Sequence, residues 1–177
     1  GTPLEAFRGL ECLSHVGGHL SIRNNAQLTS LEGLNNLRDV DGDLSIGRSG
    51  GPTTVGGGND LLTNLGGLRA LTSVGGDLRI TSNASLTSLE GLSRLTLLGG
   101  SIGIWGNRNL SNLIGLDGLA AIEGDVRIGH RTAGGGAGSA SLTSLEGLDG
   151  ISRIEGNLLI QDNVILVNLD GLRGLTF

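Results

Sequence analysis

Few residues of this chain are of the types that take part in catalysis or bind metals and cofactors. It has three histidines (His15, His19 and His130), one cysteine (Cys12), one tryptophan (Trp105) and no lysine, so all twelve basic residues are arginines. Without lysine there is no Schiff-base chemistry and no P-loop lysine. No cysteine or acidic residue recurs near the histidines at the spacing of a metal site or a catalytic triad. We therefore predict a non-enzymatic protein with no cofactor and no metal.

The strongest site candidate is a row of outward side chains around Trp105. The strand phrases of the repeat described below place Trp105 on the solvent side of a sheet, with Arg79 and Arg127 on neighbouring coils, and Arg23 and Leu159 belong to the same face. Tryptophan and arginine are enriched at interface hot spots, which predicts a partner-binding face. The alternative is an arginine stacked on an exposed ring with no partner involved.

An acidic column precedes the predicted strands: His19, Asp43, Asp77, Ser101, Asp125 and Asn157. We expect each aspartate to accept hydrogen bonds from the amides of its own corner. Calcium between Asp43 and Asp77 is the alternative, but two carboxylates are too few for a calcium site. The net charge is −5 and the arginines are scattered, so the sequence does not predict the basic patch that binds nucleic acid.

An internal repeat accounts for nearly the whole chain. The seven-residue phrase at 28–34, Leu-Thr-Ser-Leu-Glu-Gly-Leu, recurs at 62–68, 86–92, 110–116, 142–148 and 166–172, with a degenerate copy at 4–10. Its fourth position falls at residues 31, 65, 89, 113, 145 and 169, so the unit is 24 residues long with two insertions. A unit this short buries its apolar side only by stacking. We predict an all-β, right-handed, leucine-rich β-solenoid of about seven coils, in one domain spanning 1–177.

Each coil is predicted to contain strands and corners. The Gly-Asp-Leu-x-Ile phrase alternates polar and apolar residues, as a one-faced strand does, and Leu-Thr-Ser-Leu is predicted to be a second extended segment. A glycine inside every copy of the seven-residue phrase disfavours a full helix and predicts a tight corner, with a helical turn at most. Paired glycines such as Gly75-Gly76 predict a second corner with positive φ.

Asparagine recurs three residues after the strand isoleucine. The column comprises Asn25, Asn59, Asn83, Asn107 and Asn163, with Ser139 in the fifth unit, and it is predicted to satisfy corner backbone groups through its amides. Two glycosylation sequons exist, at Asn83 and Asn109, and Asn109 is the more accessible candidate. Cys12 occupies a variable, exposed column, where it is either free or paired with a segment or partner outside this chain.

The insertions, 47–58 and 129–141, are rich in glycine and serine and leave from the same corner. Insertions on one face of a solenoid often mark a binding side, whereas such compositions are typical of flexible surface loops. The Gly56-Gly57-Gly58 run lacks the lysine and the strand-to-helix arrangement of a phosphate-binding P-loop. Both ends of the chain fall inside a repeat, which favours a fragment of a longer repeat protein or a subunit of an assembly.

The phrases L-x-x-L-x-x-V-x-G-D-L-x-I at 34–46 and 68–80, the latter running on to Asn83, resemble the receptor L domain of growth-factor receptor ectodomains and fungal cell-wall surface proteins. The resemblance covers essentially the whole chain and implies a non-catalytic recognition or wall module, extracellular or at the cell surface. The shorter L-x-I-x-x-N core is also similar to the leucine-rich repeat strand.

Three functions follow from these observations. The first is protein recognition or adhesion through a rigid sheet face, and the second is a structural segment of a surface filament, appendage or wall whose partners are neighbouring subunits. The third is ice binding by the threonine and serine columns, such as Thr87 and Ser88. No apolar stretch approaches the roughly 20 residues that span a bilayer.

Overall fold

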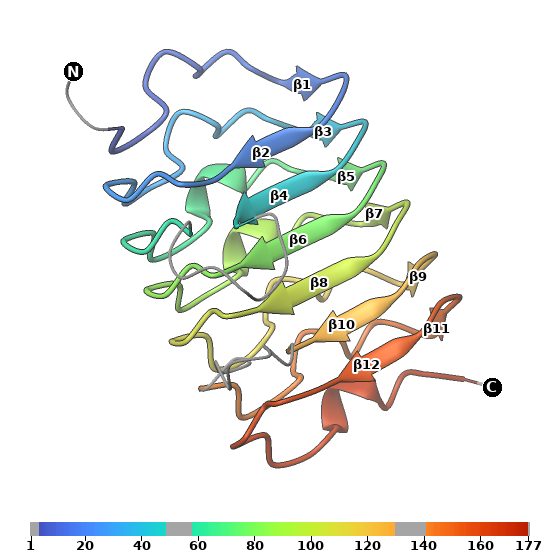
Figure 1. Ribbon diagram of the computed structural model, residues 1–177. Helices are drawn as coiled ribbons and strands as arrows, with labels where there is room; N and C mark the ends of the chain where they lie inside the picture. Colours follow the sequence, from blue (N-terminus) through green and yellow to red (C-terminus); the bar gives the residue numbers. More distant parts are fainter. Residues whose placement is uncertain (1–3, 49–57, 130–140, 177) are drawn as a thin grey trace.

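The computed structural model describes residues 4–48, 58–129 and 141–176. This part of the chain consists of short strands in parallel sheets, with only three single-turn 3₁₀ helices (Figure 1). The fold is therefore all-β, and its repeated parallel pairing fits a β-solenoid. Most of the two predicted insertions, residues 49–57 and 130–140, lies outside the described residues.

One six-stranded parallel sheet runs the length of the molecule, in the order β12-β10-β8-β6-β4-β2. Each repeat unit contributes one strand in the same register, so that Leu78 lies opposite Leu44 on one side and Ile102 on the other. The strands are β2 (Leu20–Ile22), β4 (Leu44–Gly47), β6 (Leu78–Thr81), β8 (Ile102–Trp105), β10 (Val126–Ile128) and β12 (Leu158–Ile160).

Each of these strands is preceded by a two-residue strand, and we call each such pair of strands, with its turns, a coil. These short strands are β1 (His15–Val16), β3 (Asp39–Val40), β5 (Ser73–Val74), β7 (Leu97–Leu98), β9 (Ala121–Ile122) and β11 (Arg153–Ile154). They form two sheets, β1-β3-β5-β7 and β11-β9, so the pairing is interrupted between coils 4 and 5.

A hydroxyl supports this second sheet in three coils. Thr72, Thr96 and Ser152 each donate a side-chain hydrogen bond to a carbonyl of the preceding coil. Ala120 holds the equivalent place at the interruption and has no hydroxyl to donate.

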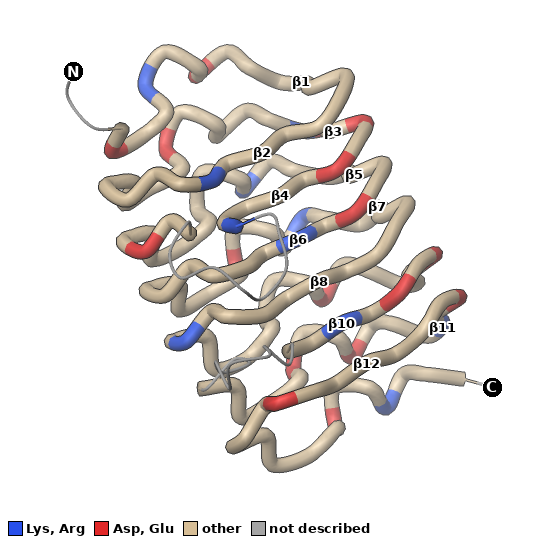
Figure 2. Tube along the Cα trace, viewed as in Figure 1, with Lys and Arg blue, Asp and Glu red and all other residues tan. Residues whose placement is uncertain are grey.

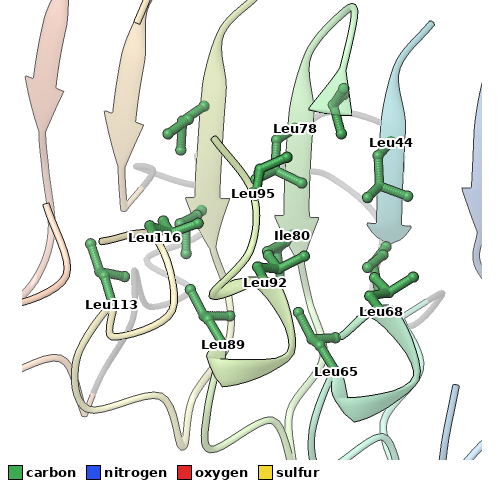
Figure 3. Close-up of a cluster of buried hydrophobic side chains, with 14 of the residues drawn as sticks. Leu44, Leu65, Leu68, Leu78, Ile80, Leu89, Leu92, Leu95, Leu113 and Leu116 are labelled. Carbon is green, nitrogen blue, oxygen red and sulfur yellow. The ribbon is translucent and has the colours of Figure 1, made fainter. Parts of the chain in front are cut away.

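A continuous aliphatic core lies between the two sheets and the corner. Its buried members are leucine, isoleucine and valine alone, and each coil stacks its side chains on those of the next (Figure 3). Leu65, Leu89 and Leu113 occupy one such column and are fully buried. Because burying an aliphatic side chain contributes about 1.5–3 kcal/mol, this stacking is the main source of stability.

The Leu-Glu-Gly-Leu segments form the predicted corner. Three of them contain 3₁₀ turns, η1 (Gly66–Leu68), η2 (Glu90–Leu92) and η3 (Asp170–Leu172), and the rest form hydrogen-bonded turns. A Cβ on Gly91 would lie 1.9 Å from the carbonyl oxygen of Leu65, and one on Gly67 would lie 1.9 Å from that of Leu31. Glycine is therefore required in these turns by the close approach of the preceding coil.

Two local predictions were wrong. The second extended segment is not Leu-Thr-Ser-Leu, which carries no strand in the described residues, but the dipeptide before the paired glycines, as in β5. The paired glycines do not adopt positive φ. Instead, a Cβ on Gly75 would lie 2.1 Å from the Asp41 carbonyl oxygen, and one on Gly76 would lie 2.3 Å from Asp43 Oδ1. These glycines make room for acceptors of the preceding coil.

The helices among the described residues are single 3₁₀ turns, and none of them could span a lipid bilayer.

Candidate functional site

The predicted recognition residues lie on the outer face of the six-stranded sheet. Arg79 and Arg127 both lie opposite Gly103, one on each side, because β6, β8 and β10 pair in register. Trp105, two residues further along β8, projects from the same face. A Cβ on Gly103 would lie 2.6 Å from Trp105 Cζ3 and 3.2 Å from Cη2, so the indole lies back over this glycine. The ring is half-buried between two arginine strands.

Aspartates hold both arginines of this row. Arg79 forms ion pairs with Asp43, at 3.1 Å between Nη1 and Oδ2, and with Asp77. Arg127 Nη2 lies 2.6 Å from Asp125 Oδ2. Figure 2 shows basic and acidic residues side by side at the start of β6 and β10. The result is a fixed Arg–Trp–Arg row, defined as Arg79, Trp105 and Arg127, whose positive charge is balanced by the three aspartates.

The other two predicted members lie at different distances from this row. Leu159 lies directly opposite Arg127 in β12 and is half-buried, so it extends the row by one coil. Arg23 is exposed just after β2, three coils from Trp105, which is about 14 Å at ~4.8 Å per strand. The structure therefore does not bring Arg23 next to Trp105.

The polar column before these strands forms a hydrogen-bonded ladder between coils. Each side chain accepts from a backbone N–H of the following coil, rather than from its own corner as predicted. The donor–acceptor pairs are Asp43 N–H to His19 Nδ1 (2.8 Å), Asp77 N–H to Asp43 Oδ1 (2.9 Å), Ser101 N–H to Asp77 Oδ1 (2.7 Å), Asp125 N–H to Ser101 Oγ (3.0 Å) and Asn157 N–H to Asp125 Oδ1 (2.8 Å). Aspartate, serine and histidine can all fill the accepting position because each offers an acceptor atom.

The ladder also lowers the pKa of two of its carboxyl groups. The hydrogen bond from the Asp77 backbone, followed by Arg79, lowers the pKa of Asp43. The backbone and side chain of Asn157, followed by Arg127, lower the pKa of Asp125. Both groups are therefore anionic at neutral pH and bind the donors around them. No group of three or more metal-ligating side chains is close enough to hold a metal within the described residues.

The asparagine column occupies the next turn. Asn59, Asn83 and Asn107 are completely buried, and Asn25 and Asn163 at the two ends are partly buried. The Nδ2 of Asn83 donates to the Ile46 carbonyl (3.1 Å), while its Oδ1 accepts from the Asn59 backbone (3.3 Å). These amides link neighbouring coils through backbone groups that would otherwise be buried without partners.

A third capping column was missed by the sequence analysis. The residue before each Leu-Glu-Gly-Leu corner caps the backbone N–H two positions on, as Ser88 Oγ does for Glu90 (3.1 Å) and Asn64 Oδ1 for Gly66 (2.9 Å). The threonine before it also binds backbone: Thr87 Oγ1 donates to the Thr63 carbonyl (3.1 Å). Alternating serine and asparagine before a turn was the available signal.

The remaining candidates are peripheral. Asn109 is exposed in the turn after β8, whereas Asn83, in the other sequon, is buried. Cys12 is exposed and free. His130 lies outside the described residues, while His15 and His19 approach Asp41 and Asp43 at 3.5 and 3.7 Å.

Comparison with known protein families finds no matching family model, and comparisons with curated proteins and with solved structures find no significant match. The function of the chain must therefore be argued from its own geometry.

Proposed function

We propose that this chain is a right-handed, leucine-rich β-solenoid of the L-domain type that acts outside the cell or on its surface as a protein-recognition or adhesion module, without catalysis. The Arg–Trp–Arg row is the observation that carries the proposal. Its large side chains are held in place before any partner arrives, by the sheet register and by Asp43, Asp77 and Asp125.

Preorganisation is what makes this face suited to binding. Immobilising one flexible side chain at an interface costs about 0.5–1.5 kcal/mol, and arginines already paired with aspartates have lost part of that freedom. The indole, resting on Gly103 rather than standing free, presents a flat apolar surface between the strands that carry Arg79 and Arg127. Such a surface fits a protein partner that offers both apolar and hydrogen-bonding groups.

The proposal is tested on an array of displayed extracellular domains and cell-wall preparations. The wild-type chain is compared with Trp105→Ala, Arg127→Ala and a matched control, Leu61→Ala, which removes an exposed apolar side chain elsewhere (44% exposed). A hot-spot tryptophan contributes 2 kcal/mol or more, so we expect Trp105→Ala to weaken binding by about 30-fold or more while Leu61→Ala leaves it unchanged. Partners that bind all four proteins equally would refute the assignment of this face.

A structural role in an assembly is the second candidate, and one observation favours it. Val167, at a position that holds threonine or serine in the other coils, is 77% exposed. Concentration-dependent assembly in sedimentation velocity, abolished by Val167→Asp and unaffected by Trp105→Ala, would favour this role over recognition.

Ice binding has less support. The hydroxyls of Thr87 and Ser88 are engaged with backbone groups, as are their counterparts in other coils. Absence of thermal hysteresis would discard it.

A further inference from the structure

A groove lies on the opposite side of the molecule from the Arg–Trp–Arg row, over the second sheet. Its volume is about 460 Å³, and it runs across coils 2 to 5. The lining residues come from β3, β5 and β7 and from the turns that follow them, together with Glu123 after β9. It therefore reaches the place where the second sheet is interrupted.

The floor of the groove has no side chains in two successive coils. The position after each short strand is Asp41 in coil 2, Gly75 in coil 3, Gly99 in coil 4 and Glu123 in coil 5. The two glycines are fixed by backbone packing, since a Cβ on Gly99 would lie 2.3 Å from the Gly75 carbonyl oxygen. The result is a bare strip of backbone with one carboxylate at each end.

Leu97 forms the apolar wall of this groove. It is 66% exposed, and the equivalent positions in the other coils hold His15, Asp39, Ser73, Ala121 and Arg153. A leucine thus replaces polar or small residues in the one coil where the sheet is interrupted. β7 pairs with β5 only, so its other edge has no strand partner among the described residues.

The charge at this edge is acidic. Asp41 Oδ2 lies 3.5 Å from His15 Nε2, an ion pair when that histidine is protonated. Glu123 lies 3.8 Å from Arg153, which is closer to Glu155 (2.6 Å). Figure 2 shows these acidic residues at the turns that follow β3, β9 and β11. One arginine faces several carboxylates, so a cationic ligand is favoured.

We propose that this groove binds a short extended peptide with a basic residue, an apolar residue and a second basic residue at alternate positions. Three coil spacings of ~4.8 Å place the two carboxylates about 14 Å apart, and four residues of extended chain span about the same length. Positions i, i+2 and i+4 of an extended peptide project to one side. Positions i and i+4 can therefore reach Asp41 and Glu123, while position i+2, about 7 Å from each, lies over the glycine strip beside Leu97.

The probe is a fluorescein-labelled, capped RGLGR peptide, with RGSGR and EGLGE as comparison peptides, measured by fluorescence anisotropy on the whole chain. We expect saturable binding of RGLGR that weakens with added salt, because exposed ion pairs are screened. Asp41→Asn and Glu123→Gln should each weaken binding about three-fold, and Leu97→Ser about five-fold or more. The matched controls Glu146→Gln and Leu61→Ser, exposed elsewhere, should not change it.

The substituted positions are exposed or border the surface, so we expect each variant to fold. A thermal melt of each variant checks this. Three results would overturn the proposal: no saturable binding of RGLGR at millimolar concentration, equal affinity for RGSGR, or equal loss in the control variants. Because Trp105 is on the other face, Trp105→Ala should bind RGLGR normally. The proposal for the groove and the proposal for the Arg–Trp–Arg row are therefore tested independently.

Discussion

The substitution Gly91→Ala tests how neighbouring coils determine the corner sequence. Judged locally, it should stabilise the chain: alanine is favoured over glycine by about 1 kcal/mol in a helical turn and also restricts the unfolded chain. The structure predicts the opposite sign. The new Cβ would lie 1.9 Å from the carbonyl oxygen and 2.2 Å from the carbonyl carbon of Leu65, where ordinary contact begins at 3.4 Å.

The magnitude follows from that overlap. Coils 3 and 4 would have to separate by roughly 1.5 Å at this corner, and both contacting atoms belong to backbone that is fixed by hydrogen bonds on each side. Overpacking of this kind costs about 3 kcal/mol, which leaves a net destabilisation of about 2 kcal/mol after the local gain. For a chain of this size the melting temperature should fall by roughly 4–8 °C.

The assay is thermal and urea unfolding monitored by circular dichroism. Gly18→Ala is the matched control, because no atom lies within 4 Å of its Cβ position and its φ is not positive. This control should be neutral or stabilising by up to about 1 kcal/mol. If Gly91→Ala is as stable as the parent, the inference that coil contacts select glycine is refuted.

Three further outcomes follow from the ladders and the row. Asn83→Ala should destabilise by about 2–4 kcal/mol in urea unfolding, because it leaves buried backbone groups such as the Asn59 N–H without their partner; a loss below about 1 kcal/mol would contradict this. The lowered pKa of Asp125 contributes stability that is present above pH ~4 and is lost as the pH falls through the folded pKa of this group. Asp125→Asn should therefore reduce the fall in the free energy of unfolding at acidic pH. An unchanged fall would argue against this contribution. Gly103→Ala should displace the indole and shift the emission of Trp105, the chain's one tryptophan, with little loss of stability; unchanged emission would show that the ring does not rest on this glycine.

The repeat period carried most of the information about the fold. A 24-residue spacing, lengthened by two insertions, places equivalent residues in one column, and apolar alternation in Leu78 to Ile80 then defines a strand and its buried side. The parallel strands of the structure agree with that all-β prediction. The second strand was misplaced because a strand of two residues is too short to show an alternation of apolar and polar residues. The Leu-Thr-Ser-Leu segment has a strand-like composition, but its hydroxyls bind backbone groups of the corner.

The site was less predictable because it depends on contacts between coils. Asp77 lies directly before β6 and Arg79 lies within it, two residues apart, so their shared face could have indicated the ion pair. The second partner, Asp43, is 36 residues away from Arg79 and becomes visible only once the coils are in register. The interruption between β7 and β9 had no clear signal in the sequence, because Arg38 also lacks the hydroxyl that is missing at Ala120 and yet β3 pairs on both sides.

The polar ladder has a consequence for how this chain can change in length. Every coil supplies an acceptor to its successor and a donor to its predecessor, so the same translation carries each unit onto the next. Gain or loss of one whole 24-residue unit leaves every junction of the same kind as before. A deletion of any other length inside a strand or corner would put three columns, acidic, asparagine and glycine, out of phase at once. Length variation in such a chain should therefore occur by whole units, or as additions at the turn between the strand and the asparagine, where residues 49–57 and 130–140 are placed in the sequence.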